Sequence, residues 1–144
     1  MSTKIRDTVQ NAAVDAVVDL IDEPGGAGAG TGTIEIRTGG QPGGGPGATA
    51  TGAVLATLTF GTTAFGSSSA GVATAAAIAS DTSVADTNTA GYARIKDGSG
   101  TALVDMKVGL TGDTTAQLTF DSVSFIAGGT CAINSLTCTC ADSV

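Results

Sequence analysis

The sequence predicts a mainly β protein, an antiparallel β-sandwich or jelly-roll-like domain that follows one N-terminal α-helix. Apolar residues near the N-terminus recur at steps of three and four, which is typical of a helix. After Pro24, apolar and polar residues alternate in short runs that Gly, Ser, Thr and Asp separate, which is typical of strands and turns. No later helical pattern alternates with these runs, so a parallel α/β sheet is not expected.

The N-terminal helix is predicted to span Thr3 to Asp22. Ser2 or Thr3 can cap its start, and Pro24 followed by Gly25 ends it. One apolar stripe has helical spacing and consists of Ile5, Val9, Ala12, Ala13, Ala16, Val17 and Leu20. A further set widens the stripe and consists of Val14, Val18 and Ile21. We therefore expect the helix to pack against the chain on one side and to meet a neighbour on another.

Residues 1–24 are thus predicted to form a helix packed on or extending from the domain, and residues 25–144 the β-sandwich domain. The first strand is TIEIRT (Thr33–Thr38), with alternating faces. The other segments with strand patterns are AVLATLTF, GVATAAAIA, GYARIKD, TALVDMKVG, AQLTF, SVSFIAG and TCAINSLTCTC. In AVLATLTF, one face carries Val54, Ala56, Leu58 and Phe60. DGSG (Asp97–Gly100) predicts a hairpin turn. Seven or eight short strands are expected.

Composition and charge exclude several classes of function. Only 3% of the 144 residues are aromatic, so the core must be built from Ala, Val, Leu and Ile and should be thin. The net charge of −7 comes without any basic run, and nucleic-acid binding needs such a run to neutralise phosphates. No segment approaches 18 uninterrupted apolar residues and the start lacks an apolar signal core, so we expect no membrane partner and synthesis in the cytoplasm.

Two glycine-rich segments precede strands: GGAGAGTG (Gly25–Gly32) and GGQPGGGPG (Gly39–Gly47). A phosphate-binding loop needs a helix N-terminus after it, and a P-loop also needs a Gly-Lys pair. Neither segment offers these features. Both are therefore interpreted as flexible connections around the first strand, and no nucleotide or other cofactor is predicted.

Candidate chemical groups are few because the chain contains no histidine. Without it, Ser–His and Cys–His pairs and the commonest general base are missing, so we predict no enzyme, no catalytic residue and no small-molecule substrate. Asp81 and Asp86 could pair as carboxylates or bind a weak calcium ion, but ordinary turn chemistry is the simpler interpretation. The same holds for Asp97, Ser99 and Thr101. One tyrosine, Tyr92, is a poor carbohydrate platform and is expected to pack in the core or an interface.

Three cysteines lie close together at Cys131, Cys138 and Cys140. Three thiolates without histidine make an incomplete zinc site, so no metal is predicted. A two-residue turn at Asn134-Ser135 would place Cys131 opposite Cys138, where a disulfide is geometrically possible. The alternative that we favour is that all three are small, buried apolar residues.

The order of several short motifs resembles a group of small phage virion proteins of the capsid decoration (cement) type. These motifs are IRTGGQP, LATLTF, AFG, GVATAAAIASDTS, ADTNTAGYARIKDGSGTAL and GGTCAIN, and the similarity extends over nearly the whole chain. The glycine-proline segment and the cysteine cluster depart from the usual pattern. The resemblance implies a virion location on the capsid surface, the major capsid protein as partner and a homo-oligomer, and it implies no catalytic residues.

Other functions share this composition. A tail, neck or fibre component would be equally acidic and poor in aromatic residues. An extracellular binding module is less favoured because a signal peptide and an aromatic platform are both lacking. An enzyme is least favoured, since no activated nucleophile is evident.

Overall fold

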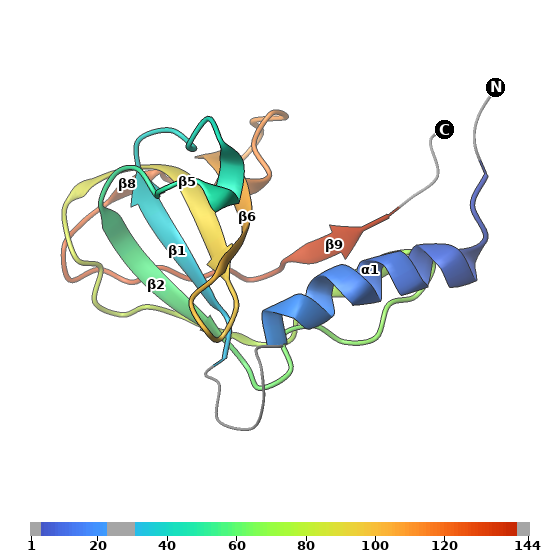
Figure 1. Ribbon diagram of the computed structural model, residues 1–144. Coiled ribbons are helices and arrows are strands. Elements are labelled where there is room, and N and C mark those ends of the chain that lie inside the picture. The colour runs from blue at the N-terminus through green and yellow to red at the C-terminus, as the bar shows by residue number, and fades with distance from the viewer. Residues whose placement is uncertain (1–3, 23–30, 141–144) are drawn as a thin grey trace.

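A computed structural model describes residues 4–22 and 31–140 of the chain (Figure 1). As predicted, the fold is mainly β and sandwich-like, with one helix near the N-terminus. The elements are α1 (Asp7–Asp22), β1 (Thr33–Thr38), the short 3₁₀ turn η1 (Gly45–Gly47), β2 (Val54–Phe60), β3 (Val72–Thr74), β4 (Ile78–Ala79), β5 (Asn88–Lys96), β6 (Ala102–Leu110), β7 (Leu118–Phe120), β8 (Ser124–Phe125) and β9 (Thr137–Thr139).

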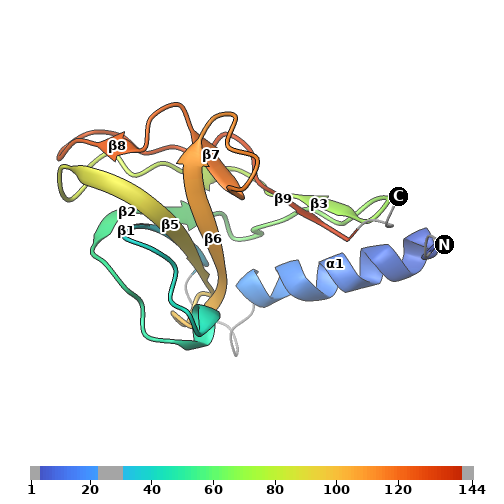
Figure 2. The ribbon, with the colours of Figure 1, turned by 90° about the horizontal axis from the view of Figure 1, so that it is seen from above.

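The main sheet has the strand order β4-β2-β1-β5-β6-β7, and β8 pairs with β5. Figure 2 shows that this sheet curls, so that β7 and β8 lie over its concave side. We call β1, β2 and β4–β8 the body. β1 has the predicted bounds, because Ile34 and Ile36 alternate with polar residues and are completely buried.

One pairing in the body differs from the predicted antiparallel arrangement. β7 lies parallel to β6, with Val108 opposite Leu118 and Leu110 opposite Phe120. The connection between the two strands is short for a parallel pair. The Asp113 carboxylate holds it by accepting hydrogen bonds from the Thr115 N–H (2.8 Å) and hydroxyl (2.7 Å). The chain can therefore turn back beside β6 without a helix.

One face of β2 is buried and the other is partly buried. Ala56, Leu58 and Phe60 share a buried face as predicted, but Leu55 on the other face is also completely buried. The segment 81–87 lies along the edge of β2, where the Ala85 N–H donates to the Leu55 carbonyl (2.7 Å). Irregular chain thus continues the edge of the sheet beyond β4.

The remaining elements form what we call the arm: α1 packed on the two-stranded ribbon of β3 and β9 (Figures 1 and 2). The arm projects from the body, and only the C-terminal end of α1 meets it. At that end Gly32 lies against Ile21, where a Cβ would come within 2.5 Å of the Ile21 methyl carbon.

Side chains on one edge of α1 bind the chain between β2 and β3. The carboxylate of Asp22 accepts hydrogen bonds from the Ala64 N–H (2.7 and 2.9 Å). The carboxylate of Asp15 accepts one from the Ser68 N–H (2.9 Å). The side-chain oxygen of Asn11 accepts from the Gly71 N–H (2.7 Å). These contacts fix which face of the helix lies on the ribbon.

The helix begins later than predicted, at Asp7 instead of Thr3. The expected caps Ser2 and Thr3 lie outside the described residues. Lys4 to Arg6 precede the helix, and the Arg6 carbonyl accepts the first hydrogen bonds from Val9 (2.8 Å) and Gln10 (3.1 Å). Asp7 then places a carboxylate in the first turn, where the helix dipole favours negative charge.

The segment GVATAAAIA, predicted as one strand, forms two. β3 pairs with β9 in the arm, whereas β4 pairs with β2 at the edge of the main sheet. Between them the N–H of Ala75 donates to the Leu136 carbonyl and that of Ala76 to the Ala64 carbonyl (both 2.8 Å). Alternation alone gives no sign of this change of partner.

Candidate functional site

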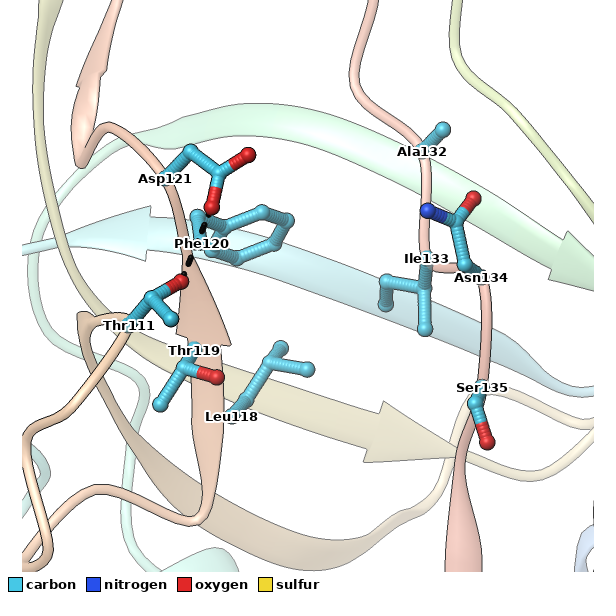
Figure 3. Close-up of a pocket in the computed structure, with 9 residues that line it drawn as sticks. All are labelled: Thr111, Leu118, Thr119, Phe120, Asp121, Ala132, Ile133, Asn134 and Ser135. Carbon is cyan, nitrogen blue, oxygen red and sulfur yellow. Dashed lines mark hydrogen bonds between the residues drawn. The ribbon is translucent and has the colours of Figure 1, made fainter.

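A pocket of about 260 Å³ lies between β7 and residues 132–135 (Figure 3). On one side the Thr111 hydroxyl donates to the Asp121 carboxylate (3.0 Å). On the other side are Ile133 and Asn134, which lie across the pocket from Asp121. Asp121 is the one titratable group among the nine lining residues. General acid–base catalysis needs a group whose pKa and position suit the proton transfer on the bound substrate. The pocket therefore supports no catalytic hypothesis.

The aspartates considered as candidates act as turn residues. Asp81 accepts hydrogen bonds from the Thr57 and Ser83 N–H groups (both 2.8 Å), and Asp86 accepts one from the Thr87 N–H (2.8 Å). Asp81 thereby ties its loop to β2. Within the described ranges no group of three or more Cys, Asp or Glu residues is placed to hold a metal ion.

The predicted hairpin at Asp97–Gly100 joins β5 to β6, and its polar groups bind one another. The Asp97 carboxylate accepts hydrogen bonds from the Ser99 N–H (2.9 Å), the Ser99 hydroxyl (2.7 Å) and the Thr101 N–H (2.8 Å). Desolvation raises the pKa of Asp97, but these hydrogen bonds outweigh it and the pKa is lowered. Turn chemistry, as predicted, accounts for all three side chains.

All three cysteines are free thiols. The predicted turn at Asn134-Ser135 does not place Cys131 opposite Cys138: Cys131 pairs with Asp81, and Cys138 pairs with Ala73 in the ribbon. The prediction of a buried residue is confirmed for Cys131, while Cys138 and Cys140 are half-buried. Burial, and then the nearby Asp81 carboxylate, raise the pKa of Cys131 to about 11. Burial also raises the pKa of Cys138. These thiols are poorly suited to nucleophilic chemistry.

The second glycine-rich segment is anchored to the sheet, which corrects its interpretation as a flexible connection. The Arg94 guanidinium donates to the carbonyls of Ala48 (3.1 Å) and Gly45 (3.4 Å). The buried Tyr92 hydroxyl donates to the Thr51 carbonyl (2.8 Å) and accepts from the Thr51 N–H (3.0 Å). Most of the first segment, Gly25–Gly32, lies outside the described residues.

Arg94 is the buried charge that the sequence pattern missed. Its guanidinium forms a two-point ion pair with the Asp105 carboxylate at 2.7 and 2.8 Å, and both side chains are 4% exposed. The Asp105 hydrogen bonds raise the pKa of Arg94 above its ordinary value, although burial opposes them. Tyr92 is completely buried, so the expected packing role is confirmed as a core role. Gly91 on β5 allows the second glycine-rich segment to lie close to the strand. A Cβ at this position would lie 1.8 Å from the Gly39 oxygen.

The clearest candidate for an interaction site is the outer face of α1. The buried face consists of Gln10, Val14, Val18 and Ile21. Outside it lies a second apolar set that is exposed to solvent, and this outer face consists of Val9, Ala12, Ala13, Ala16, Val17 and Leu20. Val9 is 57% exposed, Leu20 51% and Val17 48%. A contiguous apolar patch of this kind on an acidic chain typically marks an interaction surface.

An apolar cavity of about 100 Å³ adjoins this face. It opens between α1, the β5–β6 hairpin and the segment that leads into β9, and Val17, Val104, Met106 and Leu136 are among its lining residues. Val17 belongs to both the cavity and the outer face. The exposed apolar surface therefore continues from the helix toward the body.

No described helix is long and apolar enough to cross a membrane. Comparisons with models of known protein families, with curated proteins and with solved structures found no match.

Proposed function

We propose that this chain is a structural protein of a phage particle, and specifically a capsid decoration protein that binds the shell of the major capsid protein from outside. The observation that carries the proposal is the outer face of α1, on an arm that projects from a compact body (Figure 2). The order of the short motifs, which resembles that of small virion proteins, supports it further. The protein is made in the host cytoplasm and acts on the capsid surface, without enzymatic activity or cofactor.

Burial of exposed apolar surface is the physical reason to expect association. Apolar area on one subunit can be removed from water only by a neighbour, and each 1,000 Å² so buried is worth up to about 25 kcal/mol before the costs of association. A shell presents the same binding site many times, so weak individual contacts gain avidity when the decorating subunits also contact one another. A projecting arm suits such bridging.

The proposal is tested by purifying virions of the phage that encodes the chain and locating it with labelled subunits. We expect it on the head, and we expect filled heads without it to lose resistance to heat while the shell keeps its geometry. Absence from the particle would overturn the proposal. Presence in the tail, neck or fibre alone would replace it with the alternative virion role.

A substitution on the outer face separates assembly from folding. Because the Val17 side chain is half exposed, Val17→Asp should reduce the number of copies bound per head more strongly than it weakens folding. Thr8→Asp introduces the same charge at an exposed position on the polar side of α1 and serves as the control. Equal binding of both variants to heads would show that the outer face does not contact the shell or a neighbour.

A further inference from the structure

We propose that the outer face of α1 binds the same face of a second copy of this chain, with the two helices antiparallel across a two-fold axis. This deepens the proposed function and rests on it only in taking the chain to act in many copies. It names the partner of the arm and the residues in contact.

The spacing of the exposed residues is that of a helix–helix seam. Val9, Ala13, Ala16 and Leu20 follow one another at steps of four, three and four residues, and all four are exposed. This is the a/d spacing of a coiled coil over two heptads. Because the buried residues of α1 lie on a different side, a partner on the seam would not compete with the ribbon.

The order of side-chain sizes along the seam favours a second copy as the occupant. From the first to the last position the sizes run large, small, small, large, so the series reads the same in both directions. Two antiparallel helices then place Val9 of each copy against Leu20 of the other, and Ala13 against Ala16. The small residues meet at the two-fold axis, where they let the helices approach closely, and the same patch serves both subunits.

The distribution of charge selects the antiparallel orientation. The second half of α1 carries Asp15, Asp19 and Asp22, whereas its start carries Arg6 beside Asp7. A parallel pair would bring the acidic second halves of the two helices to the same end of the pair. An antiparallel pair brings each acidic end to the end that carries the other copy's Arg6, and it also opposes the two helix dipoles.

The first test is sedimentation equilibrium of the purified full-length chain over a wide range of concentrations. We expect a reversible monomer–dimer equilibrium, with a dimer of twice the 13.8 kDa chain mass. Ala16→Glu places two carboxylates at the two-fold axis and should weaken the dimer about 100-fold or more, because neither charge has a partner there. Thr8→Glu adds the same group at an exposed position on the polar side of α1, outside the seam, and should leave the dimer within about twofold of the native Kd.

A purely monomeric native chain would overturn the inference, as would a dimer that Ala16→Glu and Thr8→Glu affect equally. Circular dichroism of each variant shows whether the helix is retained. Leu20→Ala removes seam contact without adding charge and provides a second variant, for which we expect a weaker dimer with an unchanged spectrum.

The second test reports orientation. In a background with Cys138→Ala and Cys140→Ala, a chain carrying Val9→Cys is mixed with one carrying Leu20→Cys under mild oxidation. Antiparallel packing predicts disulfides between the two different chains. Cross-linking of each chain only to its own kind, or no cross-linking, would contradict the geometry. Both tests use the protein in solution, so a chain that dimerises but is absent from virions would refute the proposed function alone.

Discussion

The body and the arm differ in how completely they bury their apolar side chains. In the body, two-sided packing leaves Ile34, Leu55 and Leu58 without solvent exposure, and the buried charge of Arg94 is fully paired. In the arm, one helix lies on a ribbon of two short strands, and six of its nine apolar residues remain in contact with water. Figure 1 shows how little of the arm the body covers.

The difference indicates where stability and association reside. The body holds most of the core, which continues into the buried face of α1, and its buried ion pair is satisfied. An arm that is one layer thick depends on polar contacts from Asp22, Asp15 and Asn11 and keeps an apolar face available for partners. Substitutions should therefore affect the free energy of unfolding in the body and association in the arm.

The largest effect is expected at the buried ion pair of the body. Arg94→Met removes the partner of the buried Asp105 carboxylate and the donors to Ala48 and Gly45, and it should lower the free energy of unfolding by about 3–5 kcal/mol. Urea denaturation measures the loss. Arg94→Met combined with Asp105→Leu should recover much of it, since no unpaired charge then remains. A single variant as stable as the native chain would show that the pair is dispensable.

A matched pair of leucine substitutions compares the two regions directly. Leu58→Ala in the body creates a cavity at a completely buried site and should cost about 2–5 kcal/mol. Leu20→Ala on the outer face of α1 should change the free energy of unfolding by less than about 0.5 kcal/mol. Both are measured by denaturation at concentrations where the chain is monomeric. Similar costs would contradict the division between body and arm.

A smaller effect is expected at the edge of the helix. Asp22→Ala removes the acceptor of the Ala64 N–H and should destabilise the arm by about 1–2 kcal/mol. Hydrogen exchange of the Ala64 amide should become faster while amides of β1 keep their protection. Asp19→Ala is the control, because this exposed carboxylate near the negative end of the helix dipole should stabilise α1 slightly when removed.

The smallest effect concerns the loop between β6 and β7. The Thr115 hydroxyl and N–H, and then Lys107, lower the pKa of the half-buried Asp113 carboxylate from 3.8 to about 2. Because the folded pKa lies below the unfolded one, the contribution is present above pH 3.8 and is lost as the pH falls through about 2. Thr115→Ala should raise the pKa of Asp113, and Lys107→Met should raise it less. Titration of the carboxyl carbon by NMR measures both shifts, and an unchanged pKa in Thr115→Ala would contradict the assignment.

Local patterns in the sequence predicted the parts of the fold that depend on neighbouring residues. The alternation in Thr33–Thr38 gave both ends of β1, and Asp97–Gly100 formed the expected hairpin. The end of the helix at Asp22 was also predicted, because a proline two residues later cannot continue it.

Features that depend on distant residues could not be read in this way. Apolar residues cover so much of α1 that spacing alone does not show which side is buried, and the buried side includes the polar Gln10. The partner of Cys131 is Asp81, fifty residues earlier. A lysine or arginine on a strand usually faces solvent. The residues next to Arg94 in the sequence therefore do not predict its hydrogen bonds to the glycine-rich segment. The outer face of α1 followed from the excess of apolar residues, but its bounds required the structure.

The pairing of distant strands also bears on how fast the chain folds. β1 pairs with β5, and β3 pairs with β9. In the sequence β3 lies between β1 and β5, and β5 lies between β3 and β9, so the two loops that these pairings close overlap. Neither pairing can form until chain segments more than fifty residues apart have met, and the entropy of that search must be overcome first. Refolding should accordingly take milliseconds to seconds, with the β5–β6 hairpin as an early local contact and the arm exposing both faces of its helix until β9 arrives.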